Sequence, residues 1–372
     1  MTEKISLTEL SGVGEATAKK WAKLGYDSLE KIANASSQEL VQKLGINITK
    51  AQKLIAEARS ILIDQQILLE TAGKILEFQE SIIQRIPTGS KALDRILGGG
   101  IQTDASLLLG GAYSTGKTQL CLQACVNCVV DLGRKAVFIE TEPSTFKIKR
   151  LIQMFVLGRG YIPLDMTPET LAKYLTFTPE EQPDIEKAKR YISEARGFVN
   201  LGLKTEKADV WGIRHIQTPE KLYRAYELIE NKLLKQGIDV GLICIDSFIA
   251  PFRATFQGRG RLSERNEELA RHIGKLETLS SKYNLAVIMT AQVYGIPDDS
   301  GQMVARRRFG IEQKIYGGEY LLHSATYQLS LNHVQGGTKT EDICEAYLFD
   351  SPDMPKASAR FVICKEGIRD VA

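Results

Sequence analysis

One octapeptide limits what this chain can fold into. Residues 111–118 read Gly-Ala-Tyr-Ser-Thr-Gly-Lys-Thr and fit the phosphate-loop pattern G-x-x-x-x-G-K-[ST]. They lie between an apolar run at 105–109 and a helix-like segment at 119–124. In such a strand–turn–helix, the backbone N–H groups of the turn and the positive end of the helix dipole meet at one point. The pattern predicts a nucleoside triphosphate site, and its alternative is a glycine-rich turn without nucleotide chemistry.

The residue types assign chemistry to single positions. We expect the Lys117 ammonium on the β- and γ-phosphates and the Thr118 hydroxyl on Mg²⁺. Asp246 ends the apolar run 240–245 and is expected to hold the water shell of the same metal ion, although an acid there can also cap the next helix. The predicted ATP contacts of the loop are Gly111, Ala112, Tyr113, Ser114, Thr115, Gly116, Lys117, Thr118 and Gln119.

Strand-like runs alternate with amphipathic helical segments from about residue 105 onward. The apolar runs 105–109, 136–140, 240–245 and 285–289 are continuous, which is typical of a parallel sheet covered on both faces. The chain therefore predicts an α/β fold, with a mostly parallel central sheet flanked by helices and its ligands at the carboxyl ends of the strands.

Three polar residues follow two of these runs. Glu140 and Glu142 end the run that starts at Ala136, and either carboxylate can orient a water for phosphoryl transfer. Gln292 follows the run 285–289 and is interpreted either as a reporter of the γ-phosphate or as an ordinary surface amide.

Length and composition favour two domains. The chain has 372 residues, of which 43% are hydrophobic, enough for a sizeable core. Its formal net charge of +3 does not by itself indicate a nucleic-acid binder, so any such site must come from local clusters. Without a charged-then-apolar leader or an apolar run long enough to cross a bilayer, we expect a soluble intracellular protein with no membrane contact.

We expect three parts along the chain. Residues 1–62 are helical in pattern, and Gly12 and Gly14 lie in a turn that suits contact with a nucleic-acid backbone, a protein partner or simply two helices. Residues 63–84 form a connector. Residues 85–372 form the ATPase core, interrupted at about 165–210 by a charged insertion that is either a solvated helical excursion or a partner-binding surface.

Two further groups of residues have a specific chemistry. Cys121, Cys125 and Cys128 share one helix face, which we interpret as core packing, with a metal site as the alternative. Segments 256–265 and 304–310 place arginines among glycines and aromatic rings. Guanidinium groups bind phosphates and aromatic rings stack on unpaired bases, so both segments are candidates for nucleic-acid contact or for solvated loops.

Several motifs together resemble the strand-exchange recombinases of archaea and eukaryotes, the RadA type. Besides the phosphate loop and the N-terminal helix-hairpin-helix, the resemblance is carried in order by Phe252-Arg-Ala, Gly258-Arg-Gly-Arg-Leu-Ser-Glu-Arg265, Thr290-Ala-Gln-Val293, Gly317 to Thr326 and Phe349 to Pro355. It implies a RecA-type ATPase core that uses ATP and Mg²⁺, and subunits that coat single-stranded DNA as a filament and exchange homologous strands with duplex DNA. It also implies a cytoplasmic, nucleoid-associated protein in an archaeon, or a nuclear one in a eukaryote.

The resemblance also implies roles for single residues. Glu142 becomes the water-activating carboxylate, Asp246 the Walker B acid, and Arg150 the group that stacks on adenine. Gln292 and His323 relay the nucleotide state, and the cap on ATP across the subunit boundary is formed by Asp350, Ser351, Pro352 and Pro355. The implied DNA contacts are Arg253, Arg259, Arg261, Arg265, Arg306, Arg307, Arg308, Phe309, Gly317 and Gly318, with Gly12 and Gly14 in the N-terminal module.

The chain departs from this family in four places. No phenylalanine is followed by alanine three residues later, so the family's Phe-x-x-Ala polymerisation plug is absent, and Ile75, Leu76 or Phe78 is the candidate substitute. Residues 331–337 lack the expected arginine and lysine, Pro143 replaces a glycine after Glu142, and the insertion is longer than usual. The alternative functions are an ATP-switched paralogue that assists or loads a recombinase or mediator protein, and a hexameric RecA-core helicase.

Overall fold

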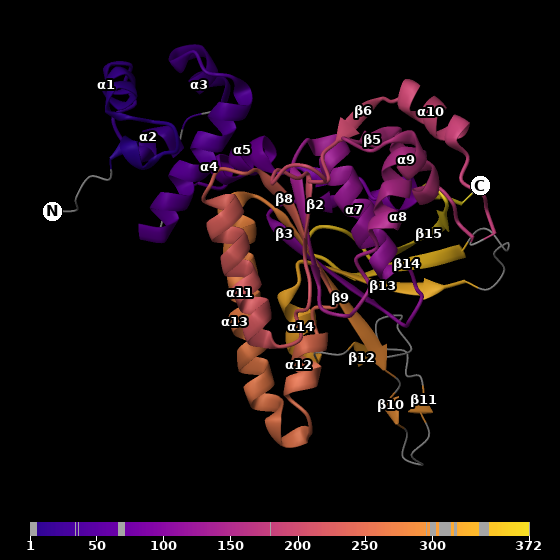
Figure 1. Ribbon diagram of the computed structural model, residues 1–372. Coiled ribbons are helices and arrows are strands. Elements are labelled where there is room, and N and C mark those ends of the chain that lie inside the picture. The colour runs from indigo at the N-terminus through magenta and orange to yellow at the C-terminus, as the bar shows by residue number, and fades with distance from the viewer. Residues whose placement is uncertain are drawn as a thin grey trace. The chain divides into compact units, whose positions relative to one another are not determined.

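The chain folds into two compact units. The computed structural model describes residues 6–33, 35, 37–65, 71–178, 180–294, 296–297, 303–304, 314–315, 318–334 and 342–371. Residues 1–84 with 281–284 form one unit, and residues 85–280 with 285–372 form the other (Figure 1). Among the described residues, no helix is both long and apolar enough to traverse a bilayer.

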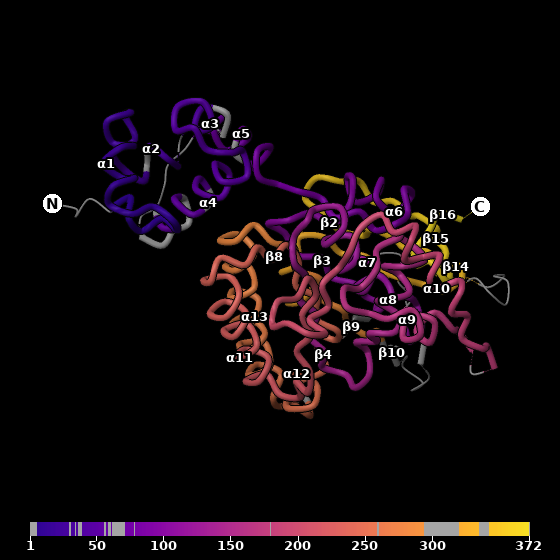
Figure 2. The backbone as a smooth tube through the Cα atoms, turned by 45° about the horizontal axis from the view of Figure 1, so that its top comes forward, coloured from indigo at the N-terminus to yellow at the C-terminus, as the bar shows by residue number. Residues whose placement is uncertain are grey.

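The N-terminal unit is a small helical module with its own core. Its buried side chains include Leu10, Trp21, Leu29, Leu40 and Leu54. Figure 2 shows the backbone path of its helices. They are α1 (Glu15–Lys23), α2 (Leu29–Ala33), α3 (Ser37–Leu44), α4 (Ile48–Gln65) and α5 (Ala72–Ile82), preceded by a 3₁₀ turn at Leu7–Glu9.

One large sheet organises the second unit, in the strand order β16-β15-β14-β13-β3-β9-β8-β4-β7. The pairs from β13 to β7 are parallel and those from β13 to β16 are antiparallel, so the predicted α/β fold with a mostly parallel sheet is confirmed. In chain order the strands are β3 (Ala105–Gly111), β4 (Lys135–Glu140), β7 (Val210–Ile213), β8 (Val240–Asp246), β9 (Ala286–Tyr294), β13 (Tyr327–His333), β14 (Asp342–Asp350), β15 (Ala357–Cys364) and β16 (Gly367–Asp370).

Helices cover both faces of the sheet because its central strands are apolar on both sides. Alternate residues such as Leu107, Phe138 and Cys244 pack in one core with helix α7 (Lys117–Leu132). Cys121, Cys125 and Cys128 of that helix are buried in this core, as the packing interpretation predicts. On the other face lie α11 (Pro219–Ile229) and α13 (Leu262–Tyr283), which run side by side in Figures 1 and 2.

Shorter elements complete the unit. Helix α6 begins after its N-cap Ser90, whose hydroxyl accepts a hydrogen bond from the Leu93 N–H. The remaining helical segments are α6 (Lys91–Ile96), α8 (Ile148–Gln153) with a π-helical continuation to Arg159, α9 (Pro168–Tyr174), α10 (Ile185–Ser193), a π-helical turn at Glu230–Leu234, α12 (Ala250–Thr255), a 3₁₀ turn at Arg259–Arg261 and α14 (Gly318–Ser324). The remaining strands are β1 (Arg85–Ile86), β2 (Ile101–Gln102), β5 (Tyr161–Pro163), β6 (Gly197–Val199), β10 (Ile296–Pro297), β11 (Met303–Val304) and β12 (Lys314–Ile315), the last of which pairs with β9.

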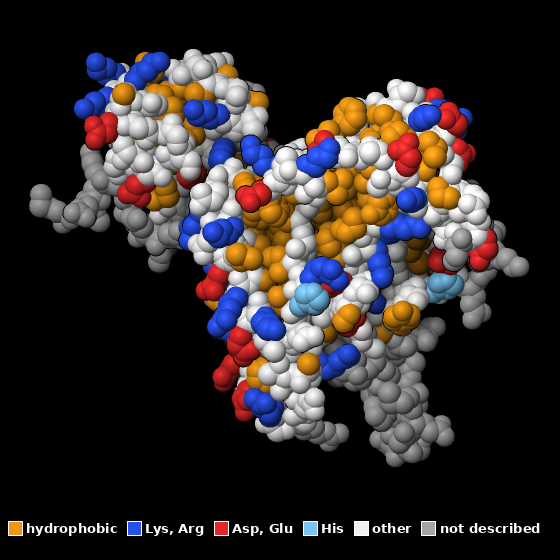
Figure 3. Space-filling view, viewed as in Figure 1, with side chains coloured by type: hydrophobic (Ala, Val, Ile, Leu, Met, Phe, Trp, Pro, Cys, Tyr) orange, Lys and Arg blue, Asp and Glu red, His pale blue; other side chains and the backbone are white. Residues whose placement is uncertain are grey.

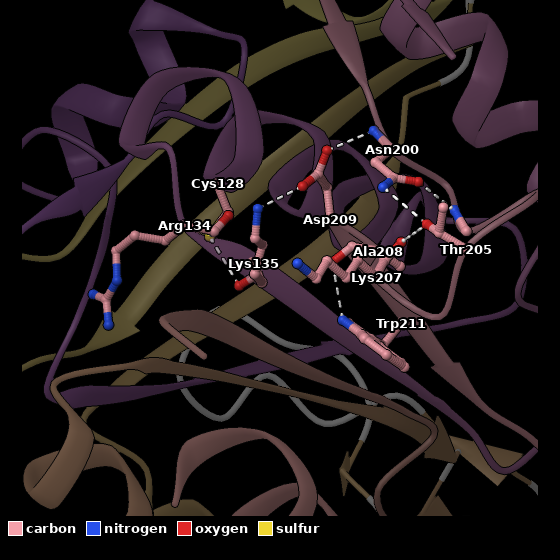
Figure 4. Close-up of polar contacts among 10 residues, drawn as sticks. Cys128, Arg134, Lys135, Asn200, Thr205, Lys207, Ala208, Asp209 and Trp211 are labelled. Atoms are coloured by element: carbon pink, nitrogen blue, oxygen red, sulfur yellow. Dashed lines mark hydrogen bonds and ion pairs between the residues drawn. The ribbon is translucent and has the colours of Figure 1, made fainter. Parts of the chain in front are cut away.

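Residues 161–209, from β5 to the start of β7, form a folded excursion at the edge of the sheet. It contains α9, α10 and the parallel pair β5–β6, over a small core that includes Leu171, Ala172 and Ala188. Asp209 fixes its return to the sheet, because its carboxylate accepts from Lys135 Nζ (2.5 Å) and from the Asn200 N–H (2.6 Å) (Figure 4). Figure 3 shows apolar side chains at its surface in the upper right, and the exposed ones are Leu164, Ile185, Phe198 and Leu203.

Candidate nucleotide site

Four parallel strands end side by side at the site. Gly111 at the end of β3 lies in register with Gln292 of β9, and Glu140 at the end of β4 lies in register with Asp246 of β8. Since carboxyl ends of parallel strands share one edge, the register brings the phosphate loop and three of the predicted polar residues to the same place.

The phosphate loop has the backbone that its glycines predict. Ser114 and Gly116 have φ angles of 60° and 92°, in the left-handed region, and α7 begins directly after Gly116. A Cβ atom at Gly111 would lie 2.7 Å from the Leu331 carbonyl oxygen. Glycine is therefore needed at 116 for its conformation and at 111 for space.

Lys117 lies across this loop. Its Nζ donates to the carbonyl oxygens of Gly111 (2.9 Å) and Ala112 (2.6 Å). Burial lowers the pKa of Lys117, while the carboxylates of Asp246 and Glu142 oppose that shift. The ammonium thus stands at the loop within the field of both acids, where a phosphate chain would be bound.

Asp246 is buried and held by two hydroxyl groups. Thr118 Oγ1 donates to Asp246 Oδ2 (2.6 Å), and Thr290 Oγ1 donates to Asp246 Oδ1 (2.5 Å). The sequence analysis missed Thr290, although a hydroxyl just before the predicted Gln292 in an apolar strand was the available signal. A hydroxyl and a carboxylate are oxygen ligands that Mg²⁺ prefers, so the residues present fit a Mg²⁺-bound nucleoside triphosphate.

Glu142 and Gln292 form a polar link away from the loop. Gln292 Nε2 donates to Glu142 Oε1 (2.9 Å), and Arg253 donates through Nη1 to Gln292 Oε1 (3.0 Å). Burial raises the pKa of Glu142, and Asp246 raises it further against the opposing effects of Arg253 and Lys117. Pro143 therefore does not prevent the Glu142 carboxylate from reaching the site.

Glu140 has a different environment. Its carboxylate accepts from Arg214 Nε (2.7 Å) and from the Phe146 N–H (3.1 Å). Burial favours the neutral acid, but these hydrogen bonds outweigh it and the pKa of Glu140 lies below its usual range. Of the two glutamates, Glu140 is occupied in fixing the loop after β4, and Arg214 is a partner that the sequence analysis did not anticipate.

Arg150 lies beside the first turn of α7. Its guanidinium donates to Gln119 Oε1 (2.8 Å) and to the carbonyl oxygens of Lys365 (2.7 Å) and Cys364 (2.6 Å). The predicted adenine-stacking residue is thus held next to the phosphate loop, and Gln119 is drawn into the same cluster.

The predicted cap and relay residues lie on the antiparallel side of the sheet and on α14. Asp350 ends β14 and accepts from Gln328 Nε2 (2.9 Å). Ser351 stabilises the following turn by accepting from the Met354 N–H (2.8 Å), and Pro352 and Pro355 are exposed. His323 is exposed on α14, so it does not join the cluster around Asp246 in a single chain.

Besides Arg253, only some of the predicted DNA contacts in the ATPase core lie among the described residues. Arg261 pairs with Glu264 (2.7 Å) and lies over the Phe256 ring, while Arg265 is half-buried in α13. Arg259 lies in a 3₁₀ turn, and Gly318 begins α14. The others, Arg306, Arg307, Arg308, Phe309 and Gly317, lie outside the described residues.

The N-terminal hairpin places Gly12 before Gly14, the N-cap of α1. Gly12 has a φ of 74°, so the turn requires glycine there. Glu57 of α4 accepts from both the N–H and the hydroxyl of Ser11 in the same turn. A carboxylate therefore already occupies one amide of this hairpin.

Sequence comparison adds the family to this geometry. The profile described as Rad51 matches residues 78–161 and 217–371. The chain belongs to the Rad51 family. A second profile, the SAM-like helix-hairpin-helix tandem, matches residues 4–60. The excursion between β5 and β7 falls into the gap of the Rad51 match, so the family profile does not account for it.

Proteins called DNA repair and recombination protein RadA are similar to this Rad51-family chain over almost its full length. The protein from Metallosphaera sedula is 31% identical over 370 residues, covering 98% of this chain and 95% of the relative. Those from Methanococcus maripaludis and Ignicoccus hospitalis are each 32% identical, over 381 and 375 residues, and cover 98% of this chain and 99% and 95% of the relative. The resemblance to RadA-type recombinases is thereby confirmed.

Proposed function

We propose that this chain is an ATP-hydrolysing recombinase that assembles on single-stranded DNA and promotes pairing and strand exchange with homologous duplex DNA. The observation that carries the proposal is the hydrogen-bonded series Glu142–Gln292–Arg253. It leads from Glu142, whose charge acts on Lys117 of the phosphate loop, to Arg253 of α12, directly before the arginine-rich segment 256–265. Family membership and the RadA relatives support the same function.

The site residues divide the chemistry. Lys117 and the loop amides bind the phosphates, Thr118 and Asp246 hold Mg²⁺, and Glu142 accepts a proton from the attacking water. When bound, Mg²⁺-ATP supplies the transferable phosphoryl group, with the metal neutralising phosphate charge. Gln292 ties Glu142 to Arg253, so nucleotide state and DNA contact bias the same side chain. Arg150 faces the adenine.

The subunit contacts are part of the proposal. Asp350 to Pro355 and His323 serve the nucleotide of a neighbouring subunit, which agrees with their exposure in the single chain. The N-terminal module 1–62 contacts DNA through its Gly12–Gly14 hairpin. Residues 63–84 connect this module to the ATPase core, which residues 85–372 form. Residues 306–309 and 317–318 supply further contacts to DNA.

Pairing of strands tests the proposal directly. Wild-type protein with single-stranded DNA, Mg²⁺ and ATP should form filaments and pair a homologous duplex, and Lys117→Ala should do neither. Wild-type protein that binds ATP but never pairs strands would refute it.

Two observations favour a second function, an ATP-switched mediator that loads another recombinase. The chain has no Phe-x-x-Ala plug, and β13 ends in the exposed residues Asn332 and His333 where the family resemblance leads us to expect basic residues. Electron microscopy on single-stranded DNA separates the two functions: regular helical filaments support the recombinase, and discrete rings or small complexes support the mediator.

A further inference from the structure

The Arg150 guanidinium lies where a nucleoside leaves the phosphate loop. Gln119, to which it donates, directly follows Thr118, the last residue of the loop. Because residues 111–118 take the phosphates, ribose and base must emerge beside this first turn of α7. The other two hydrogen bonds of Arg150 end on the carbonyl oxygens of Cys364 and Lys365, between β15 and β16. The position of Arg150 therefore depends on that turn.

Two residues of the excursion hold the same turn. The Lys365 ammonium lies 4.7 Å from the centroid of the Phe177 ring, a cation–π distance, and 3.9 Å from Glu181 Oε1. The Glu181 carboxylate also accepts from the Phe177 N–H (2.5 Å), which fixes ring and carboxylate relative to each other. Phe177 and Glu181 thus hold the side chain of Lys365 in place. The carbonyl oxygen of the same Lys365 accepts a hydrogen bond from Arg150.

The segment that carries Phe177 is fastened to α8, the helix of Arg150. Gln153 Nε2 donates to the carbonyl oxygens of Tyr174 (3.0 Å) and Thr176 (3.2 Å), and Lys149 Nζ donates to Thr176 Oγ1 (3.2 Å). Figures 1 and 2 both draw α8 beside α9, which leads into this segment. The excursion therefore braces Arg150 from its own helix and from the β15–β16 turn.

We propose that the excursion is a working part of the nucleotide site, in which Phe177 and Glu181 are positioning residues for the purine base. They hold Lys365, whose backbone, together with Cys364, orients Arg150 toward the base. The inference rests on the proposed ATP site and adds what the Rad51 profile leaves out, since residues 162–216 fall in its gap. It predicts that the excursion affects the affinity for the nucleoside and leaves the affinity for the phosphates unchanged.

Calorimetry of the full chain with two probes tests this. ATP reports phosphates and base together, and inorganic tripolyphosphate reports the phosphate loop alone. Phe177→Ala should weaken the binding of ATP about two- to tenfold, the range expected for loss of a cation–π contact. The affinity for tripolyphosphate should stay unchanged. Phe198→Ala is the matched control, because Phe198 is an exposed phenylalanine of the same excursion, and it should change neither affinity.

A second pair of variants keeps the test valid if Phe177→Ala fails to fold. Lys365→Met removes the cation and should weaken the binding of ATP but not that of tripolyphosphate. Lys365→Arg keeps a cation over the Phe177 ring and should restore the affinity for ATP. Unchanged ATP affinity in Phe177→Ala and Lys365→Met, or equal weakening of both probes, would overturn the inference. Wild-type protein that binds neither probe would instead overturn the ATP site itself.

Discussion

At the scale of single residues, the site depends on how the buried carboxyl group of Asp246 is hydrogen-bonded. Each carboxyl oxygen of Asp246 accepts a hydrogen bond from a threonine hydroxyl, one from Thr118 on α7 and the other from Thr290 on β9. Burying an unpaired carboxylate is costly, and hydrogen bonds to the charged form offset that cost. The two threonines thus fix both carboxyl oxygens of Asp246 at the end of an otherwise apolar strand.

Glu142 is the residue for which hydrolysis and binding should separate. Glu142→Gln retains an oxygen that accepts from Gln292 but removes the proton acceptor. We expect the turnover of ATP to fall by about 10²- to 10⁴-fold, the usual contribution of a general base, with ATP affinity within a few-fold of wild type. Steady-state hydrolysis and calorimetry measure the two effects. Equal loss of binding and turnover would contradict the assigned role.

The same substitution should stabilise the fold in a pH-dependent way. The pKa of Glu142 is raised, first by burial and then by Asp246, so its ionised form is less favourable in the folded chain than in the unfolded chain. Near pH 7, Glu142→Gln should therefore increase the free energy of unfolding. The gain should disappear as the pH falls through the raised pKa to the ordinary carboxyl range, where both states are protonated. Urea unfolding at several pH values checks the sign.

Arg253 should couple DNA binding to turnover. Its hydrogen bond to Gln292 is the last link from Glu142, and a hydrogen bond to a charged group is worth about 1.5 to 3 kcal/mol. Arg253→Ala should lower the stimulation of hydrolysis by saturating single-stranded DNA about tenfold or more. Arg271→Ala is the control, because Arg271 pairs with Glu268 on α13. Full stimulation in Arg253→Ala would break the proposed link.

At the scale of elements, the sequence predicts what periodicity and fixed spacing encode. The runs at 105–109, 136–140, 240–245 and 285–289 became β3, β4, β8 and β9 because continuous apolar strands can only be buried on both faces. The insertion is expected at about 165–210 because the segment is charged and longer than the family's usual one. Within it, Asp184 N-caps α10.

Pairings between distant elements were not predictable in this way. Arg214 reaches Glu140 across 74 positions, and nothing local in the sequence marks it as the partner. Thr290 reaches Asp246 across 44 positions and is marked only by its hydroxyl in an apolar strand. The antiparallel strands β14 and β15 mix buried residues with half-buried or exposed ones, so they carry a weaker signal. The parallel pair β5–β6 has three residues in each strand, too few for a periodicity.

The anchor of the excursion gives a prediction at this scale. Asp209 is largely buried and accepts hydrogen bonds from both Lys135 and the Asn200 backbone, so Asp209→Ala leaves two half-buried donors without their acceptor (Figure 4). We expect a loss of about 2 to 4 kcal/mol in the free energy of unfolding. Lys204→Ala, which removes an exposed ion pair with Asp165, should cost less than about 1 kcal/mol. Similar values for both variants would show that Asp209 is not an anchor.

At the scale of the whole molecule, the feature that decides assembly is the contact between subunits. A filament needs each chain to bind the next, yet the sequence has no Phe-x-x-Ala plug. The connector does form a helix, α5, with two apolar side chains at its surface: Ile75 is 41% exposed and Leu76 is 55% exposed. Phe78, the third candidate, has a side chain outside the described residues.

If α5 supplies the missing plug, polar substitution there should abolish filaments without unfolding the chain. Burying one such side chain stabilises an interface by roughly 1.5 to 3 kcal/mol, so Ile75→Ser with Leu76→Ser should weaken subunit association by about 10²- to 10⁴-fold. Leu228→Ser on α11 is the matched control, since Leu228 is 50% exposed in the ATPase core. Sedimentation and electron microscopy with ATP and single-stranded DNA provide the measurement. Intact filaments in the double variant would exclude these two residues, and filaments lost in Leu228→Ser as well would place the contact on a broader apolar surface.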